Sequence, residues 1–221
     1  MHEGHRQRLK ARFLKEGLDS FEPHEVLELL LFYVIPRSNT NPIAHELIRE
    51  FGSLSRVLEA NPTDLMKVEG ISCHSATLIH MIPALTRIYN QDKWGEKPTL
   101  HTSQLAGEFS ASLLAGRPQE TLIMICLNKA KKVLNWKVIS EGDIGETMLS
   151  QRMIVEEALL QNAQGIILAH NHPSGSLKPS YEDQIATRSI CHTLQALHME
   201  LIDHFIVAGN DFVGMGDLNM L

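Results

Sequence analysis

The spacing of apolar and polar residues divides the chain into a helical first part and a mixed second part. Before about residue 90, apolar residues recur at helical spacing between polar turns. The predicted helices cover residues 5–16, 24–35, 42–51 and 74–84, with short helical turns at 53–59 and 63–67. These elements predict an all-helical N-terminal domain.

After residue 100, helical stretches alternate with short apolar runs that are typical of buried strands. The predicted helices cover residues 103–114, 153–161 and 180–198. The predicted strands cover residues 121–127, 133–140, 165–169, 201–207 and 212–215, and a glycine-rich loop is expected at 141–147. This order predicts an α/β domain in which helices flank a mixed sheet.

A polar stretch at residues 90–97 contains Gly95, is followed by Pro98, and is predicted to be an interdomain linker. We therefore expect two domains, at residues 1–92 and 102–221. A length of 221 residues is sufficient for two such cores.

Composition narrows the protein class. No apolar run approaches the ~20 residues of a membrane helix, and the polar start, Met1 to Arg6, lacks the apolar core of a secretory signal. The three cysteines are widely spaced, which argues against a disulfide framework. These features predict a cytoplasmic protein without a membrane partner.

The formal net charge of −6 argues against general binding of polyanions by the whole chain. Positive charge nevertheless gathers in the first predicted helix, at Arg6, Arg8, Lys10, Arg12 and Lys15. A solvated helix face is the favoured interpretation, and a phosphate-binding patch is the alternative.

Residues 64–84 have the pattern of a helix, a tight turn with Gly70, and a second helix. This pattern resembles the helix-hairpin-helix module, in which turn N–H groups and a helix N-terminus hold a nucleic-acid phosphate. Here Ser72 replaces the second turn glycine, and a basic residue soon after the turn is missing. A structural hairpin and a DNA-binding hairpin both remain open.

The strongest chemical pattern follows the apolar run 165–169. His170 and His172 are two residues apart, so their side chains should project to the same side as the strand ends. Pro173 and Gly175 then predict a turn, and Asp183 falls in the first turn of the next helix. Two imidazoles, a carboxylate and an open fourth position form the ligand set of a hydrolytic zinc site.

The alternative interpretations of these residues are structural. A single histidine at a strand end is more often structural than ligating, although the combination favours a metal. Ser180 and Asp183 also resemble a helix capping pair, and such capping is compatible with ligation because it would hold Asp183 in place.

The spacing His-x-His-x(7)-Ser-x(2)-Asp resembles the signature of the JAMM metalloproteases, which have the JAB/MPN fold. The segment His-Asn-His-Pro-Ser-Gly, residues 170–175, resembles the core of the bacterial RadC-like (UPF0758) proteins. The resemblance covers residues 102–221 and extends more weakly through the N-terminal part. It implies Zn²⁺ bound by His170, His172 and Asp183.

The same resemblance implies two catalytic residues. A JAMM enzyme uses a glutamate at the start of a strand as the base for the water that zinc activates, and Glu120 matches this position. Glu141, at another strand end, is the rival candidate. Ser180 matches the serine that stabilises the oxyanion.

Other titratable residues are assigned structural roles. Asp203 and His204 could lie behind the zinc ligands, but a core histidine is the favoured interpretation for His204. His192 and His198 are predicted to be surface residues. The adjacent carboxylates Glu156 and Glu157 face different directions on a helix, which argues against a catalytic pair.

Three functions are compatible with these features. The first is a JAMM-type zinc hydrolase that cleaves a peptide or isopeptide bond in a peptide or protein substrate. The second is a metal-dependent nuclease or other DNA-processing enzyme that holds nucleic acid with its N-terminal domain, and the RadC resemblance also implies DNA repair. The third is a DNA-associated module with structural zinc, which the open coordination position disfavours.

Overall fold

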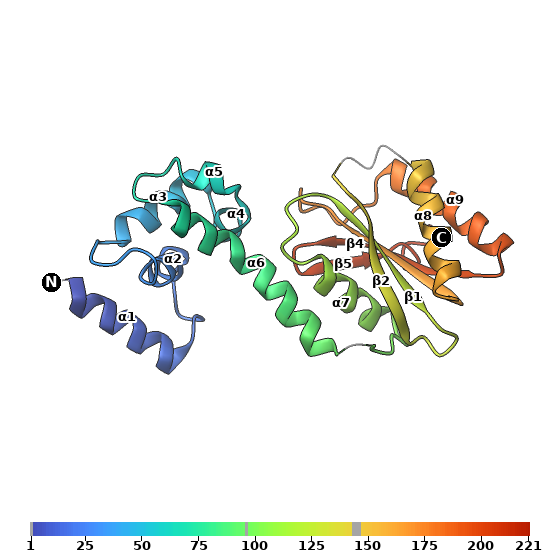
Figure 1. The fold of residues 1–221 in the computed structure, drawn as a ribbon, viewed down its shortest axis with the longest axis horizontal. Helices are drawn as coiled ribbons and strands as arrows, with labels where there is room; N and C mark the ends of the chain where they lie inside the picture. The colour runs from blue at the N-terminus through green and yellow to red at the C-terminus, as the bar shows by residue number, and fades with distance from the viewer. Residues whose placement is uncertain (1, 96, 143–146) are drawn as a thin grey trace. The chain divides into compact units, whose positions relative to one another are not determined.

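The structure is a computed structural model that describes residues 2–95, 97–142 and 147–221. The chain divides by its internal packing into two compact units, residues 1–85 (unit 1) and 86–221 (unit 2) (Figure 1). The division falls inside the helix α6, Cys73–Trp94.

Unit 1 is entirely helical in its described residues. Besides the first part of α6, its helices are α1 (His2–Glu16), α2 (Pro23–Leu31), α3 (Asn41–Phe51), α4 (Leu54–Glu59) and α5 (Pro62–Leu65). Apolar residues at helical spacing meet in a core that includes Leu27, Leu47 and Ile79, and a smaller cluster lies between α1 and α2 around Leu9 and Leu29. This arrangement confirms the predicted helical character of the N-terminal part.

The helix α2 ends four residues earlier than predicted. It stops at Leu31, and the next residues form tighter turns in which the N–H groups of Tyr33 and Val34 bond to carbonyls three residues back. Arg6 donates hydrogen bonds to the carbonyls of Phe32 and Ile35, at 3.2 and 2.7 Å. A side chain 26 or more residues away therefore stabilises the end of this helix, and the local pattern does not encode it.

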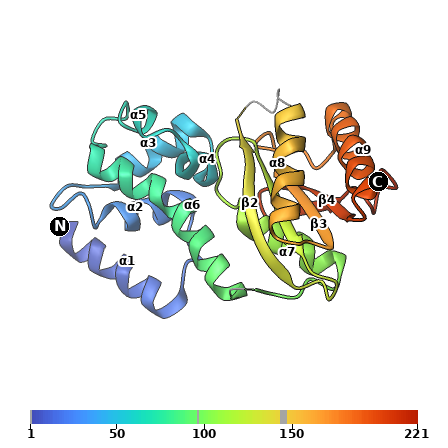
Figure 2. The same cartoon turned by 45° about the vertical axis from the view of Figure 1, so that its right-hand side comes forward.

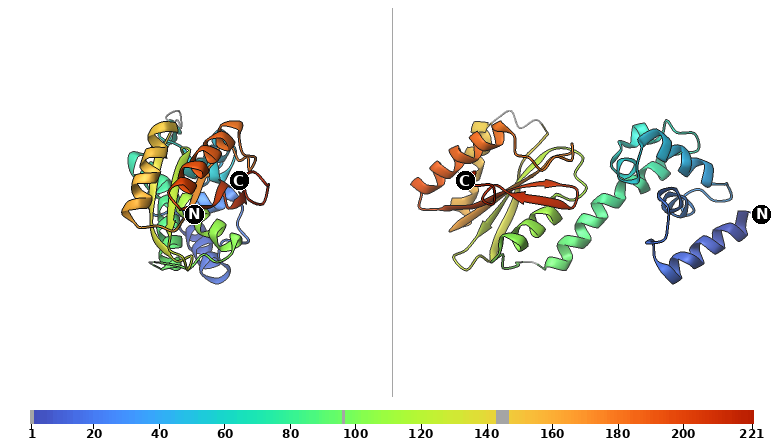
Figure 3. Two further views of the ribbon diagram at one scale, coloured as in Figure 1. Left: turned by 90° about the vertical axis from the view of Figure 1, so that its right-hand side faces the viewer. Right: turned by 180° about the vertical axis from the view of Figure 1, so that it is seen from behind.

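The helix α6 is much longer than the predicted helix 74–84 and includes most of the predicted linker (Figure 3). Its last part is anchored within unit 2: Trp94 contacts the ring of Phe109 edge-on at 5.4 Å, and Arg87 donates a hydrogen bond to the carbonyl of Ala115 at 3.2 Å. These contacts explain why a polar sequence continues as helix. Within the described ranges, no helix is both long enough and apolar enough to cross a membrane.

Unit 2 contains a five-stranded mixed sheet in the order β2-β1-β3-β4-β5. The strands are β1 (Thr121–Leu127), β2 (Val133–Glu141), β3 (Gly165–Asn171), β4 (Glu200–Ala208) and β5 (Asp211–Gly214). Only the β3–β4 pair is parallel, and the helix α9 (Tyr181–Ala196) connects these two strands.

Helices cover both faces of this sheet (Figure 2). The helix α7 (Ser103–Leu114) packs on one face, where Ile123 and Ile167 point. The helices α8 (Thr147–Leu160) and α9 pack on the other, where Leu122 and Leu168 point. The two central strands β1 and β3 are buried along their whole length, which explains their continuous apolar sequences. This arrangement confirms the predicted fold class.

The expected glycine-rich loop at 141–147 is described only in part. Residues 143–146 lie outside the described residues, and Thr147 already belongs to α8.

A glycine in α7 allows close contact with the last strand. A Cβ atom on Gly107 would lie only 2.0 Å from Cε2 of Phe212. We therefore expect Gly107→Ala to lower the free energy of unfolding by about 1–3 kcal/mol, the usual cost of overpacking, although alanine favours helix. Denaturant unfolding should show the loss, and the double change Gly107→Ala/Phe212→Leu should recover part of it. A more stable Gly107→Ala protein would contradict the tight contact.

Candidate metal centre

The strand β3 carries the first two residues of the predicted site. His170 pairs with Leu122 of β1 and Ile206 of β4, and its ring shares the sheet face of Ile166 and Leu168. His172 follows just after the strand, where its N–H still bonds to the carbonyl of Val207 at 2.8 Å. The two rings therefore project together, with their Nε2 atoms 2.9 Å apart.

The start of α9 supplies the carboxylate. Ser180 caps the helix: its Oγ accepts the N–H of Asp183 at 3.0 Å, and its own N–H donates to Oδ2 of Asp183 at 2.7 Å. This reciprocal pair holds the Asp183 side chain against both rings. Its oxygens lie 3.2 Å from Nε2 of His170 and 3.6 Å from Nε2 of His172.

Glu120 reaches the same point from β1. Because β1 and β3 are antiparallel, the start of β1 lies beside the end of β3. Oε1 of Glu120 is 3.8 Å from Nε2 of His170 and 3.9 Å from Nε2 of His172, and its side chain is 38% exposed. Glu120, His170, His172 and Asp183 thus offer ligand atoms within 4.8 Å of one another, a group that could hold a metal ion.

Glu141, the alternative candidate for the catalytic base, has a different environment from Glu120. Glu141 pairs with Thr121 across the β1–β2 ladder, and its exposed carboxylate lies 3.6 Å from Nη1 of Arg117. It does not belong to the four-residue group found among the described residues.

The electrostatics of the site favour a cation. Burial opposes the negative charge of Asp183, but the interactions of its carboxylate with the nearby His170 ring and with Ser180 outweigh it and hold the Asp183 pKa well below its usual value. Nδ1 of His172 donates to the carbonyl of Ser176 at 2.8 Å, because a carbonyl can only accept. Nε2 of a neutral His172 therefore keeps its lone pair toward the group.

His204 of β4 has a closer relation to the site than the sequence indicated. It is a core histidine, as favoured, but its Nε2 lies 2.9 Å from Nδ1 of His170. Its Nδ1 lies 2.6 Å from Oγ1 of Thr187 of α9, a residue that the sequence did not single out. Burial, together with repulsion from His170, lowers the His204 pKa to about 3, so its ring is neutral.

Asn171 is a second residue that the sequence analysis missed. It is buried and points to the face opposite the histidines, where its Oδ1 accepts the N–H of Thr121 at 2.9 Å. Its Nδ2 donates to the carbonyls of Gln119 and Arg117, at 3.0 and 3.2 Å. These bonds fasten the backbone on both sides of Glu120. The only feature of the sequence that could have indicated this role is the position of a side-chain amide between two histidines.

Removal of the Asn171 amide tests this clamp. In Asn171→Ala the N–H of Thr121 loses its acceptor, and the carbonyls of Gln119 and Arg117 each lose a donor, so the free energy of unfolding should fall by about 1–3 kcal/mol. Glu120 should also become less well placed, which we expect to slow any reaction that depends on it by about 10–100-fold. Metal content should stay unchanged, and an unchanged rate at full metal occupancy would contradict the clamp.

The remaining candidates lie elsewhere. The histidines at 192 and 198 are exposed, as predicted. Glu157 is buried and bonds to Nζ of Lys137 at 2.8 Å, whereas Glu156 pairs with Arg152 at 2.7 Å on the helix surface. The two adjacent glutamates therefore have separate structural partners.

The basic helix α1 uses two of its arginines within unit 1. Arg6 donates to backbone carbonyls after α2, and Nη1 of Arg12 lies 2.9 Å from Oε1 of Glu25. Contacts of this kind reduce the charge that α1 can offer to phosphates and favour its structural interpretation.

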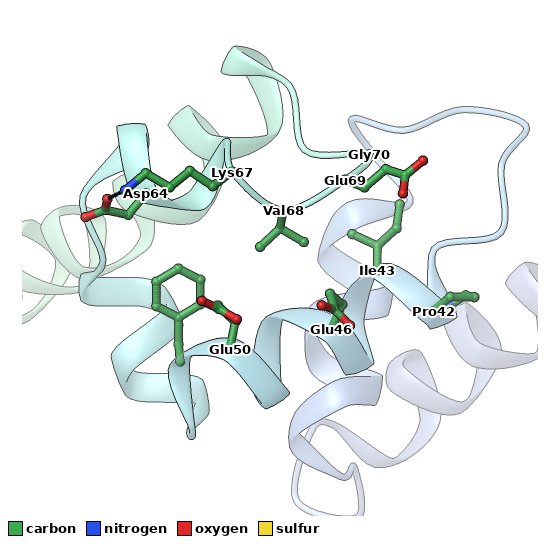
Figure 4. Close-up of a pocket in the computed structure, with 10 residues that line it drawn as sticks. Pro42, Ile43, Glu46, Glu50, Asp64, Lys67, Val68, Glu69 and Gly70 are labelled. Carbon is green, nitrogen blue, oxygen red and sulfur yellow. Dashed lines mark hydrogen bonds and ion pairs between the residues drawn. The ribbon is translucent and has the colours of Figure 1, made fainter.

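The predicted hairpin borders a groove with an acidic rim (Figure 4). Gly70 adopts a positive φ of 89° in the turn, above the side chain of Ile43. The residues that line the groove include four acidic ones, Glu46, Glu50, Asp64 and Glu69, together with Pro42, Ile43, Phe51, Val68 and Gly70. The lysine among the lining residues, Lys67, is bonded to Asp64 at 2.6 Å. This concentration of negative charge opposes the approach of a nucleic-acid backbone to the groove side of the hairpin.

The sequence profile of the RadC-like JAB domain matches residues 100–220, the segment that contains all four residues of the candidate metal group. The chain belongs to the RadC-like JAB domain family. Among its relatives, a UPF0758 protein of Fusobacterium nucleatum subsp. nucleatum is 33% identical over 217 residues, which cover 95% of this chain and 94% of that protein. UPF0758 proteins of Pseudomonas fluorescens and Burkholderia thailandensis are 29% and 30% identical and cover 96% and 91% of this chain. The similarity to these relatives therefore includes unit 1 as well as the JAB domain.

Proposed function

We propose that this RadC-like protein is a JAMM-type hydrolase that uses Zn²⁺ to cleave peptide or isopeptide bonds. The observation that carries the proposal is the position of Glu120. Its carboxylate lies 3.8–3.9 Å from both imidazole Nε2 atoms, farther than Asp183 from either ring. Three ligands with a second carboxylate just outside them are the arrangement that a metal-assisted hydrolysis requires.

The donor set fits zinc. Ligands bound tetrahedrally at about 2.0–2.2 Å from Zn²⁺ lie about 3.3–3.6 Å from one another. One Asp183 oxygen lies 3.2 Å from Nε2 of His170 and the other lies 3.6 Å from Nε2 of His172, which is close to this separation. The two Nε2 atoms, 2.9 Å apart, are closer together than bound ligands would be. Two nitrogen ligands and one oxygen ligand also match the preference of zinc. We assign His170, His172 and Asp183 as the ligands.

Each residue then has a chemical role. Zinc, when bound, would polarise a water molecule and lower its pKa. Glu120, which is partly exposed and not a ligand, accepts a proton from that water and later returns it to the leaving group. The Ser180 hydroxyl already accepts the N–H of Asp183, and no acceptor for its proton is found in the described parts of the chain, so it can donate to a developing oxyanion.

The choice of a peptide or isopeptide bond rests on the JAMM resemblance of the motif. The competing nuclease function needs a surface that holds a polyanion, and the acidic groove beside the hairpin, together with the internal pairing of Arg6 and Arg12, argues against such a surface in unit 1. We therefore place DNA processing second.

The decisive experiment incubates the full-length protein with a peptide library that includes isopeptide-linked lysines and, separately, with labelled DNA. Each incubation is done with added Zn²⁺ and with a chelator. We expect zinc-dependent cleavage in the peptide arm alone. Zinc-dependent cleavage of DNA alone would favour the nuclease, and zinc binding without cleavage in either arm would contradict the hydrolase proposal.

A further inference from the structure

A chain of hydrogen bonds leads from the backbone of α9 to the ring of His170. The hydroxyl of Thr187 lies 2.6 Å from the carbonyl of Asp183 and 2.6 Å from Nδ1 of His204. Nε2 of His204 lies 2.9 Å from Nδ1 of His170. Both Thr187 and His204 are buried, so water does not compete for these bonds.

The direction of each bond follows from chemistry. A carbonyl oxygen can only accept, so Thr187 donates its single proton to Asp183. The thioether of Met215, 3.5 Å from the same hydroxyl, is a weaker and more distant acceptor. The Thr187 oxygen must then accept from Nδ1–H of His204. An imidazole that carries its proton on Nδ1 has its lone pair on Nε2, so Nε2 of His204 is an acceptor.

The last bond decides the tautomer of His170. Nδ1 of His170 must donate to Nε2 of His204, which leaves the lone pair of a neutral His170 on Nε2. That atom faces His172 and Asp183 at 2.9 and 3.2 Å. One hydrogen bond to the carbonyl of Ser176 likewise holds the proton of a neutral His172 on Nδ1 and leaves its lone pair on Nε2.

We propose that Thr187 and His204 are positioning residues that fix His170 in the tautomer required for metal binding. The inference rests on the proposed metal site and adds two residues that act on it through His170. Groups behind a metal-ligating histidine orient its ring and raise its basicity, and their loss costs about 10–100-fold in metal affinity. We expect a loss of this size when the Thr187 hydroxyl is removed.

Two changes at Thr187 separate this role from packing. Thr187→Val keeps the shape and removes the hydroxyl, so His204 loses the acceptor for its Nδ1–H and can carry its proton on Nε2 instead. Thr187→Ser keeps the hydroxyl and removes a methyl group. If the hydroxyl positions His170, Zn²⁺ affinity measured by chelator competition should fall about 10–100-fold in Thr187→Val and stay near wild type in Thr187→Ser. A packing role predicts the reverse order, because only the serine leaves a cavity.

Thr193→Val is the matched control. Thr193 lies on the same helix and also bonds to a carbonyl four residues back, but it has no histidine partner among the described residues and should leave Zn²⁺ affinity unchanged. His204→Leu should weaken binding at least as much as Thr187→Val. NMR of the ring nitrogens should show His170 protonated on Nδ1 in the zinc-loaded wild-type protein.

Unchanged zinc affinity in Thr187→Val would overturn the inference while leaving the zinc site intact. A wild-type protein that binds no zinc would instead overturn the proposed function. The two failures are therefore distinguishable in one titration series.

Discussion

Glu120→Gln should lower the rate of hydrolysis by about 10²–10⁴-fold, the usual contribution of a general acid–base residue. The amide keeps the size and shape of the carboxylate but cannot accept a proton. Because Glu120 lies outside the three proposed ligands, we expect full zinc occupancy and an unchanged free energy of unfolding. The measurement is the rate of zinc-dependent cleavage of the best library peptide, together with metal analysis of the same sample.

Glu141→Gln is the matched control for this change. Glu120 directly precedes β1 and Glu141 is the last residue of β2, but Glu141 faces Arg117 and is not part of the candidate metal group found among the described residues. Its replacement should leave the rate largely intact. Loss of activity in Glu141→Gln with a normal rate in Glu120→Gln would exchange the two roles. Loss of zinc in Glu120→Gln would make Glu120 a ligand instead of a base.

His172→Ala should weaken Zn²⁺ binding by more than about 100-fold, because a lost ligand costs more than a lost group behind a ligand. The ring lies at the rim of the site with a side chain that is 13% exposed, so its removal leaves a gap that water can fill. We expect the fold of both units to persist. Metal content after dialysis, chelator competition and circular dichroism on one preparation would measure both effects.

His192→Ala provides the control for the loss of an imidazole. His192 lies exposed on α9, and its replacement should change neither metal content nor rate. The combined change His170→Ala/His172→Ala should abolish stoichiometric binding. If the double variant still carried one zinc per chain, the metal would lie elsewhere and the proposed ligand set would be wrong.

The sequence by itself predicted the fold class and much of the candidate site, because both depend on local rules. Alternation along a strand places His170 and His172 on one side, and the capping pattern of Ser180 places Asp183 in the first turn of α9. The continuous apolar runs predicted a central strand at β1 and a buried strand at β3. The resemblance to the JAMM signature added Glu120, whose approach to the two rings depends on antiparallel pairing of β1 with β3.

Tertiary contacts decided what local rules could not. The polar end of α6 continues as helix because Trp94 and Arg87 find partners in unit 2, and α2 ends early where Arg6 binds the carbonyls that follow it. The amide of Asn171 gained its clamping position only when the segment before β1 came to lie beside the end of β3. Each depends on partners fifteen or more residues away, which no short window of sequence contains.

The position of His204 depends on a single irregularity in β4. Ile166 pairs with Leu201 but Ile167 pairs with Asp203, so the register shifts by one residue between them. Such a shift exchanges the faces of every later side chain in the strand, and it directs His204 toward Thr187 and His170. Strict alternation from Leu201 would have placed Asp203 on that face instead. The sequence therefore determined which residues β4 contains. The pairing of β4 with β3 determined that His204, and not Asp203, faces α9 and supports the site.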